Sequence, residues 1–122
     1  DLEALKERGQ LLEAQGKYAP AFNLWASLVR QLVKQAAADN AKKEHYLECY
    51  YHMTWCLYKH GQGADTPEKK AKATRDAAQQ IVQVERRWEG FGSDASKKRY
   101  ADLLSAEPAL KEAYEQLKGK GK

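Results

Sequence analysis

The stretch ERGQLLEAQGKYAPAFNLWASL, residues 7–28, decides the fold. Apolar residues recur every three or four positions on both sides of Gly16, which is the spacing of helices that bury one face. Gly16 suits the left-handed residue that ends a helix, and Pro20 suits the first turn of the next helix, where a missing N–H costs nothing. The stretch therefore predicts two helices, over about 2–15 and 18–38, joined by a very short turn.

Helical periodicity continues through the rest of the chain, and no segment shows the strict alternation of a half-buried strand. Asp39 has N-cap chemistry, so we expect a third helix over about 41–60, ended by Gly61. Thr66 has the same chemistry and precedes a proline, which predicts a fourth helix that runs to about residue 88.

The C-terminal part depends on how Pro108 is accommodated. Either one helix kinks there, or Ser105 caps a separate sixth helix with Glu107 and Pro108 in its first turn. We favour the second because these residue types suit those positions, and we expect Ser93 or Asp94 to cap the fifth helix. The sequence thus predicts an all-α fold of five or six helices in a single domain, residues 1–122, with helix pairs over about 2–38, 41–88 and 94–118.

Composition excludes several classes of function. Hydrophobic residues make up 43% and charged residues 31% of 122, a globular balance in which no apolar run is long enough to cross a bilayer. The net charge is +4, but each lysine cluster has acidic residues nearby, which argues against nucleic-acid binding. No phosphate loop and no nucleophile with an identifiable base are present, so we expect no enzyme and no cofactor.

The two cysteines say a little about the setting of the protein. Cys49 and Cys56 lie two turns, about 10 Å, apart along one expected helix, which is too far for a disulfide. Free cysteines are common in reducing compartments, so they favour a cytoplasmic location only weakly. Because the chain starts at Asp1 without an initiator Met, we expect it to be a piece of a longer protein.

The first helix pair carries a recognisable signature. Small and large residues alternate at fixed offsets in Arg8-Gly9-x-x-Leu12, Gly16-x-Tyr18 and Ala21-x-x-x-Trp25. This pattern resembles that of the tetratricopeptide repeat (TPR) family. Gly9 and Ala21 would be the small residues where two helices cross closely, and Leu12 and Trp25 would fill the space around the crossing.

A second pair resembles the pattern less well. Tyr50, Met53, Leu57 and Gly61 stand where the first pair has its large residues and its terminal glycine, but Thr54 replaces the inner glycine. The pair-to-pair offset is about 45 residues, against the usual ~34 of the family. The C-terminal pair shows almost no signature and looks like a capping unit. The resemblance implies a short, right-handed α-solenoid of stacked antiparallel helix pairs.

The resemblance also implies a site. In such arrays the first helix of each pair lines a concave groove that holds an extended peptide or a partner helix. The expected groove residues are Lys6, Gln10, Glu13, Tyr51, His52, Trp55, Tyr58 and Lys59. Aromatic rings beside a lysine suit a binding hot spot, although Trp55 could equally be core, and for Tyr46 and Tyr50 we favour the core. We therefore expect a non-catalytic scaffold or adaptor that binds a protein or peptide.

Two alternatives remain open. Five potential metal ligands fall within a stripe about 80° wide on the third helix. They are His45, Cys49, His52, Cys56 and His60. One helix presents only two neighbouring ligands to one ion and the chain has no other His or Cys, so we favour packing over a zinc site, which carboxylates such as Glu48 would have to complete. The other alternative is an end fragment of a longer repeat array, whose surfaces contact only the parent chain.

Overall fold

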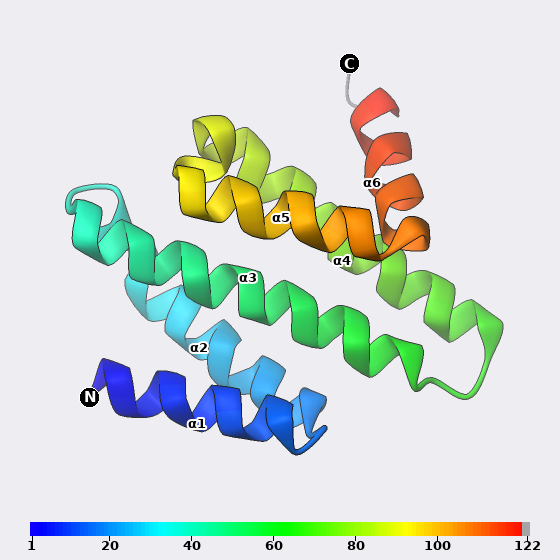
Figure 1. Cartoon of the computed structure of the whole chain (residues 1–122), viewed down its shortest axis with the longest axis horizontal. Coiled ribbons are helices and arrows are strands. Elements are labelled where there is room, and N and C mark those ends of the chain that lie inside the picture. The colour runs from blue at the N-terminus through cyan, green and yellow to red at the C-terminus, as the bar shows by residue number, and fades with distance from the viewer. Residues whose placement is uncertain (121–122) are drawn as a thin grey trace. The chain divides into compact units, whose positions relative to one another are not determined.

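A computed structural model describes residues 1–120, which form six α-helices and one 3-10 turn with no strand. The predicted all-α fold with six helices is confirmed. The chain divides into two compact units, Asp1–Lys59 and His60–Lys122, and each is described by itself. The helices are α1 (Leu2–Ala14), α2 (Tyr18–Ala36), α3 (Asn40–Gln62), α4 (Pro67–Arg87), α5 (Asp94–Ala106) and α6 (Pro108–Lys120) (Figure 1). Their stacking into a solenoid stays a prediction.

The turn between α1 and α2 follows from Gly16. Its φ is +75°, the left-handed conformation that glycine adopts at little cost. The Gly16 N–H donates to the Glu13 carbonyl at 2.9 Å, and the Lys17 N–H donates to the Leu12 carbonyl at 2.8 Å. These two bonds satisfy carbonyls that the end of a helix leaves open. The chain reverses within three residues, and α2 runs antiparallel to α1 (Figure 1).

α2 provides much of the buried surface of the first unit. Its buried residues follow a single stripe: Ala21, Trp25, Leu28, Leu32 and Ala36. α1 is more peripheral, since its leucines are at most half-buried and Leu11 is 58% exposed. The predicted cap of α3 is confirmed, because the Asp39 carboxylate accepts the N–H groups of Ala41 and Lys42 at 2.8 and 3.2 Å.

The expectation that Gly61 ends the third helix is wrong. α3 continues to Gln62, and Gly61 is a buried residue inside it. A methyl group added at Gly61 would overlap the Cβ of Ala73 in α4. The glycine is needed because α3 and α4 approach each other closely, and a left-handed turn plays no part. α4 begins as predicted, with the Thr66 hydroxyl accepting the Lys69 N–H at 3.2 Å.

The link between α4 and α5 is a short 3-10 turn, Glu89–Gly92, with unusual backbone. Phe91 has a φ of +62°, a backbone conformation that is unfavourable for any residue other than glycine. Its ring is nevertheless buried and stacks on Tyr100, with the ring centroids 5.0 Å apart. Burial and stacking offset the backbone cost. Ser93 then caps α5 by accepting the Ser96 N–H at 3.2 Å.

Pro108 separates α5 from α6, so the predicted sixth helix is confirmed. The predicted cap is not, because Ser105 lies in the last turn of α5 and Glu107 is the single residue between the two helices. The backbone of Glu107 is not helical, with φ −125° and ψ 86°. A proline disfavours helical backbone in the residue before it, which places the break at Glu107.

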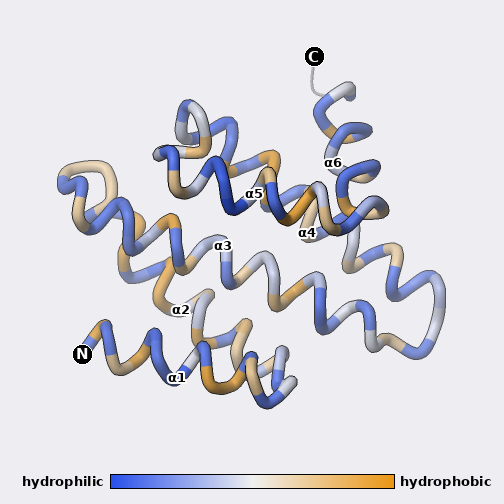
Figure 2. Tube along the Cα trace, in the orientation of Figure 1, coloured by the Kyte–Doolittle hydropathy of each residue, from blue (hydrophilic) through white to orange (hydrophobic). Residues whose placement is uncertain are grey.

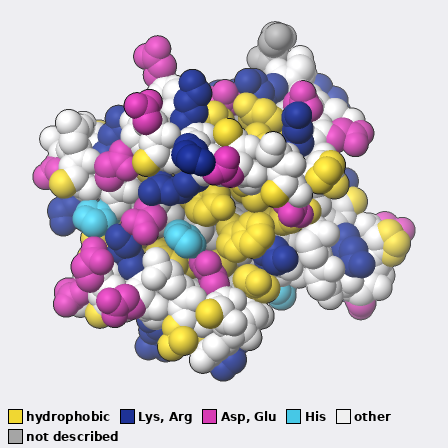
Figure 3. All heavy atoms as spheres, viewed as in Figure 1, with side chains coloured by type: hydrophobic (Ala, Val, Ile, Leu, Met, Phe, Trp, Pro, Cys, Tyr) yellow, Lys and Arg dark blue, Asp and Glu magenta, His cyan; other side chains and the backbone are white. Residues whose placement is uncertain are grey.

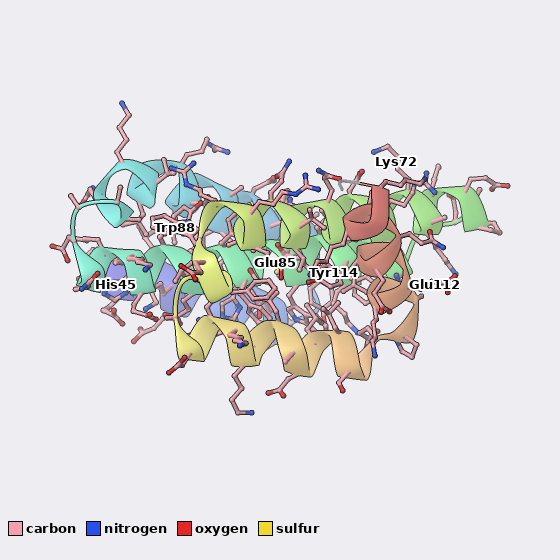
Figure 4. All side chains as sticks on the ribbon, turned by 90° about the horizontal axis from the view of Figure 1, so that it is seen from above. His45, Lys72, Glu85, Trp88, Glu112 and Tyr114 are labelled. Atoms are coloured by element: carbon pink, nitrogen blue, oxygen red, sulfur yellow. The ribbon has the colours of Figure 1, made fainter. Side chains whose placement is uncertain are left out.

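The second unit is held together by contacts of α4 with α6 and by the 3-10 turn with its neighbours. α4 buries five residues: Ala77, Ala78, Ile81, Val82 and Val84. At the edge of this core, Glu85 accepts hydrogen bonds from the Tyr114 hydroxyl at 2.6 Å and from the Lys118 ammonium at 3.2 Å (Figure 4). Burial and the bond to Glu85 raise the pKa of Tyr114.

Every helix mixes hydrophilic and hydrophobic residues along its length (Figure 2). Among residues 1–120, no helix combines the length and the apolar character that crossing a bilayer requires.

Candidate functional site

α1 and α3 lie side by side through two polar contacts. Lys6 Nζ on α1 is 2.8 Å from Glu48 Oε1 on α3. Seven residues further along α1, Glu13 Oε2 is 2.8 Å from His52 Nδ1, which lies four residues after Glu48. Both contacts advance in the same direction along the two helices, so α1 and α3 are parallel (Figure 1). We call the residues Lys6, Glu13, Glu48 and His52 the α1–α3 seam.

The Lys6 end of the seam is a nearly buried charge. The side chain of Lys6 is 9% exposed, and its ammonium also lies 3.5 Å from Glu3 Oε1 and 3.2 Å from His45 Nδ1. Burial alone would lower the pKa of Lys6, but the hydrogen bond and charge of Glu48, with those of Glu3, raise it. The folded unit therefore keeps Lys6 charged. On the face drawn in Figure 3, histidines lie beside acidic and basic side chains.

The Glu13 end of the seam connects to the core of the unit. Glu13 Oε2 also accepts a weak hydrogen bond from Cys56 Sγ at 3.4 Å. The His52 ring stacks on the indole of Trp25 in α2, with centroids 4.5 Å apart and planes 17° apart. Trp25 is fully buried and lies against Gly9 in α1. One chain of contacts thus joins all three helices.

Gly9 is a point of close approach between α1 and α2. A Cβ placed on Gly9 would lie 2.5 Å from Cζ2 and 2.6 Å from Cε2 of Trp25. Side chains do not tolerate such a distance, so the absence of a side chain at Gly9 makes room for the ring. Ala21 is fully buried, as expected of a small residue near the crossing, but the group that covers Gly9 is Trp25.

An aromatic surface adjoins the seam on α3. Tyr51 and Trp55 are half-buried and lie within about 40° of each other around the helix. The Lys59 ammonium lies 5.1 Å from the centroid of the Trp55 ring, a cation–π arrangement. Tyr58, whose centroid is 6.4 Å from that of Trp55, is buried and presents little surface. Gln10, between Lys6 and Glu13 on α1, is exposed.

The eight expected groove residues therefore have different environments. Lys6 and Glu13 on α1 and His52 on α3 take part in the contacts between these two helices, and Tyr58 is buried. The residues that present surface are Gln10, Tyr51, Trp55 and Lys59. Whether they bind a partner stays a prediction.

The cysteines of the His/Cys stripe are buried. Burial, followed by the charge of Glu48, raises the pKa of Cys49 to about 12. Burial and the neighbouring Glu13 raise the pKa of Cys56 as well. Both thiols are thus held in the protonated form at neutral pH. Within residues 1–120, no three His, Cys, Asp or Glu side chains are grouped so that they could hold a metal ion.

None of the protein-family models, curated proteins and solved structures compared with this chain matches it. The class of the protein is therefore defined by its secondary structure alone. The described part is all helical and divides into two compact units.

Sequence reasoning missed two features that shape the units. The pairing of Lys6 with Glu48 depends on the register of two helices far apart in the chain, which no local pattern records. The contact of Gly61 with Ala73 did have a signal, because glycine and alanine are twelve residues apart there, as they are in Gly9 and Ala21. The interpretation of Gly61 as a helix terminator hides its match to the first pair.

Proposed function

We propose that residues 1–59 form a TPR-like interaction module that binds an extended protein segment or a partner helix alongside α1 and α3. The observation that carries the proposal is the parallel placement of these two helices, joined by Lys6 with Glu48 and Glu13 with His52. In TPR-like arrays the first helices of successive pairs run parallel and line the binding face. The signature of residues 8–25 supports the same assignment.

The seam and the aromatic surface would have different roles in binding. Lys6, Glu13 and His52 hold α3 in register against α1 and would position the binding face. Tyr51 and Trp55 supply ring area at a small entropic cost, which is typical of residues that dominate binding energy. Gln10 would contribute a hydrogen-bonding amide from the opposite wall.

Lys59 indicates the chemistry of the partner. Its ammonium lies over the Trp55 ring, so a carboxylate of the partner could pair with Lys59 while an apolar side chain of the partner covers the ring. The net charge of +4 also favours an acidic partner. We therefore propose that the module prefers segments with acidic and apolar residues close together.

A peptide library displayed on phage and selected against the folded chain supplies the probe. The affinity of a selected peptide is then measured by fluorescence anisotropy for the wild type and for the double variant Tyr51→Ala/Trp55→Ala. We expect the double variant to bind at least about tenfold more weakly, as the loss of hot-spot residues does.

The matched control is Leu11→Ala, which removes an exposed large apolar side chain of α1, outside the seam. It should bind like the wild type. An unchanged affinity in a double variant that melts at the wild-type temperature would refute the assignment of the site.

A further inference from the structure

The second unit has a shallow depression between α4 and α6, far in sequence from the proposed module. Its volume is about 270 Å³. Its lining comes from Ala71, Thr74 and Arg75 of α4, and from Ala109, Glu112, Ala113 and Gln116 of α6. Alanines lie on both walls, and the two charged residues, Arg75 and Glu112, stand on opposite walls and are exposed.

The charges of the depression are not used within the chain. Neighbouring lysines of α4 are neutralised locally, since Lys69 pairs with Asp65 at 2.9 Å and Lys72 with Asp76 at 2.6 Å. In the part of the chain that the structure describes, Arg75 forms no ion pair with any carboxylate, Glu112 included. Among residues 1–120, the one hydrogen bond that Glu112 accepts is long, 3.4 Å, and comes from Gln116 on its own helix.

We propose that this depression is the contact surface for a second copy of the chain. A two-fold axis that lies in the contact plane and runs along the depression, between its two walls, sets α4 of each copy opposite α6 of the other, so that Arg75 of each copy faces Glu112 of the other. The patch is therefore complementary in charge to itself. The alanines let α4 and α6 of the two copies approach closely, and Arg with Glu forms the stronger, forked type of ion pair.

The symmetry makes this proposal easy to test, because each substitution alters both ends of the interface. Arg75→Glu sets two carboxylates against each other twice, and Glu112→Arg does the same with two guanidinium groups. The double variant Arg75→Glu/Glu112→Arg restores both pairs with their signs exchanged. A site for an acidic peptide or another anion would respond differently, since losing Arg75 would not be repaired at Glu112.

Sedimentation velocity over a concentration series measures the self-association of the full chain. We expect a reversible monomer–dimer equilibrium for the wild type. Each single variant should associate at least about tenfold more weakly, because juxtaposed like charges cost several kcal/mol. The double variant should associate within about threefold of the wild type, and added salt should weaken both.

Two controls have the same changes in net charge on exposed residues elsewhere in the unit. One control is Arg86→Glu, because Arg86 lies about 16 Å from Arg75 along α4. The other is Glu89→Arg, because Glu89 lies in the 3-10 turn. Both should associate like the wild type. Ala109→Gln fills the depression without a change of charge and should weaken the dimer.

A wild type that stays monomeric at every concentration would overturn the proposal. So would a double variant that associates no better than the single ones. Circular dichroism of each variant shows that the helices are intact. The result is independent of the peptide-binding module, because the dimer surface shares no residue with it.

Discussion

Gly9 shows at the scale of one residue why a small side chain is required. Replacing it by alanine places a methyl group 2.5 Å from the ring of Trp25, which is fully buried and cannot turn away. Overpacking of this kind costs about 1–3 kcal/mol, and the better helix propensity of alanine returns up to about 1 kcal/mol. Gly9→Ala should thus lower the free energy of unfolding by up to about 2 kcal/mol, measured by urea titration.

Gly119 offers the matched control for this substitution. It lies in the last turn of α6, with no atom within 4 Å of an added Cβ. Gly119→Ala should leave the free energy of unfolding unchanged or slightly higher. If Gly9→Ala proved as stable as Gly119→Ala, Trp25 would not lie over Gly9.

The contact of Gly61 with Ala73 allows a reciprocal test. Gly61→Ala should destabilise the second unit by about 1–3 kcal/mol, because two Cβ atoms would then overlap. Ala73→Gly alone should cost about 1 kcal/mol through its lower helix propensity. The double variant moves the missing methyl group across the contact, so it should be more stable than the sum of the single changes implies. Strict additivity in the double-mutant cycle would contradict the contact.

Burial of Cys49 and Cys56 predicts slow thiol chemistry. The pKa of Cys49 is raised to about 12, and that of Cys56 is raised too, from 9.0 in both cases. At pH 8 the native chain should therefore react with a thiol reagent far more slowly than the chain in urea, where two thiols per chain react. Absorbance of the released reagent measures this. Native labelling at the rate found in urea would show that the thiols are accessible.

At the scale of elements, Lys6 fixes α1 against α3, and this contact depends on pH. Folding raises the pKa of Lys6 above 10.5, so its stabilisation is complete below about pH 10.5 and is lost as the pH rises through the folded value. Lys6→Met should lower the free energy of unfolding at pH 8 by about 1–3 kcal/mol, because Glu48 loses a charged hydrogen bond. Urea titrations at successive pH values provide the measurement.

The comparison with Lys6→Met separates this residue from others that titrate in the same range. Tyr114 and both cysteines also have raised pKa values, so the wild type loses stability from these groups too as the pH rises. Lys6→Met should still lose the stability that Tyr114 and the cysteines contribute as the pH rises. It should not show the further loss of stability that is due to Lys6. Parallel stability curves for the two proteins between pH 8 and 11 would mean that Lys6 makes no such contact.

Helix ends were the elements that the sequence predicted best, because their chemistry is local. Gly16 and Thr66 act where they stand, through bonds to residues at most five positions away. The prediction that Ser105 caps the sixth helix is wrong because Pro108 disfavours helical backbone in the residue just before it. The break between α5 and α6 therefore lies at Glu107. Gly61 misled because one residue type serves both as a terminator and as a point of close approach, and only the facing Ala73 distinguishes them.

At the scale of the whole molecule, periodicity correctly predicted an all-α fold, while the arrangement of its parts could not be derived in the same way. The division into Asp1–Lys59 and His60–Lys122 falls inside α3, just before Gly61 and Gly63, and those glycines predict the end of a helix and not a boundary between units. The candidate site was predictable in its residue types, since Tyr51, Trp55 and Lys59 stand together in the sequence. The role of Lys6 and Glu13 as ties between helices was not, because it depends on register.

The parallel placement of α1 and α3 is the claim on which the proposed module depends. A nitroxide attached at Glu3→Cys, at the start of α1, tests it by NMR line broadening in the native chain. The buried thiols of Cys49 and Cys56 should not take up the label. We expect the amides at 41–48 to be broadened and the amides at 54–59 to stay sharp. Residues 41 and 57 are about 24 Å apart along α3, so the two ends of the helix should respond differently. Broadening at 54–59 with sharp amides at 41–48 would contradict the account.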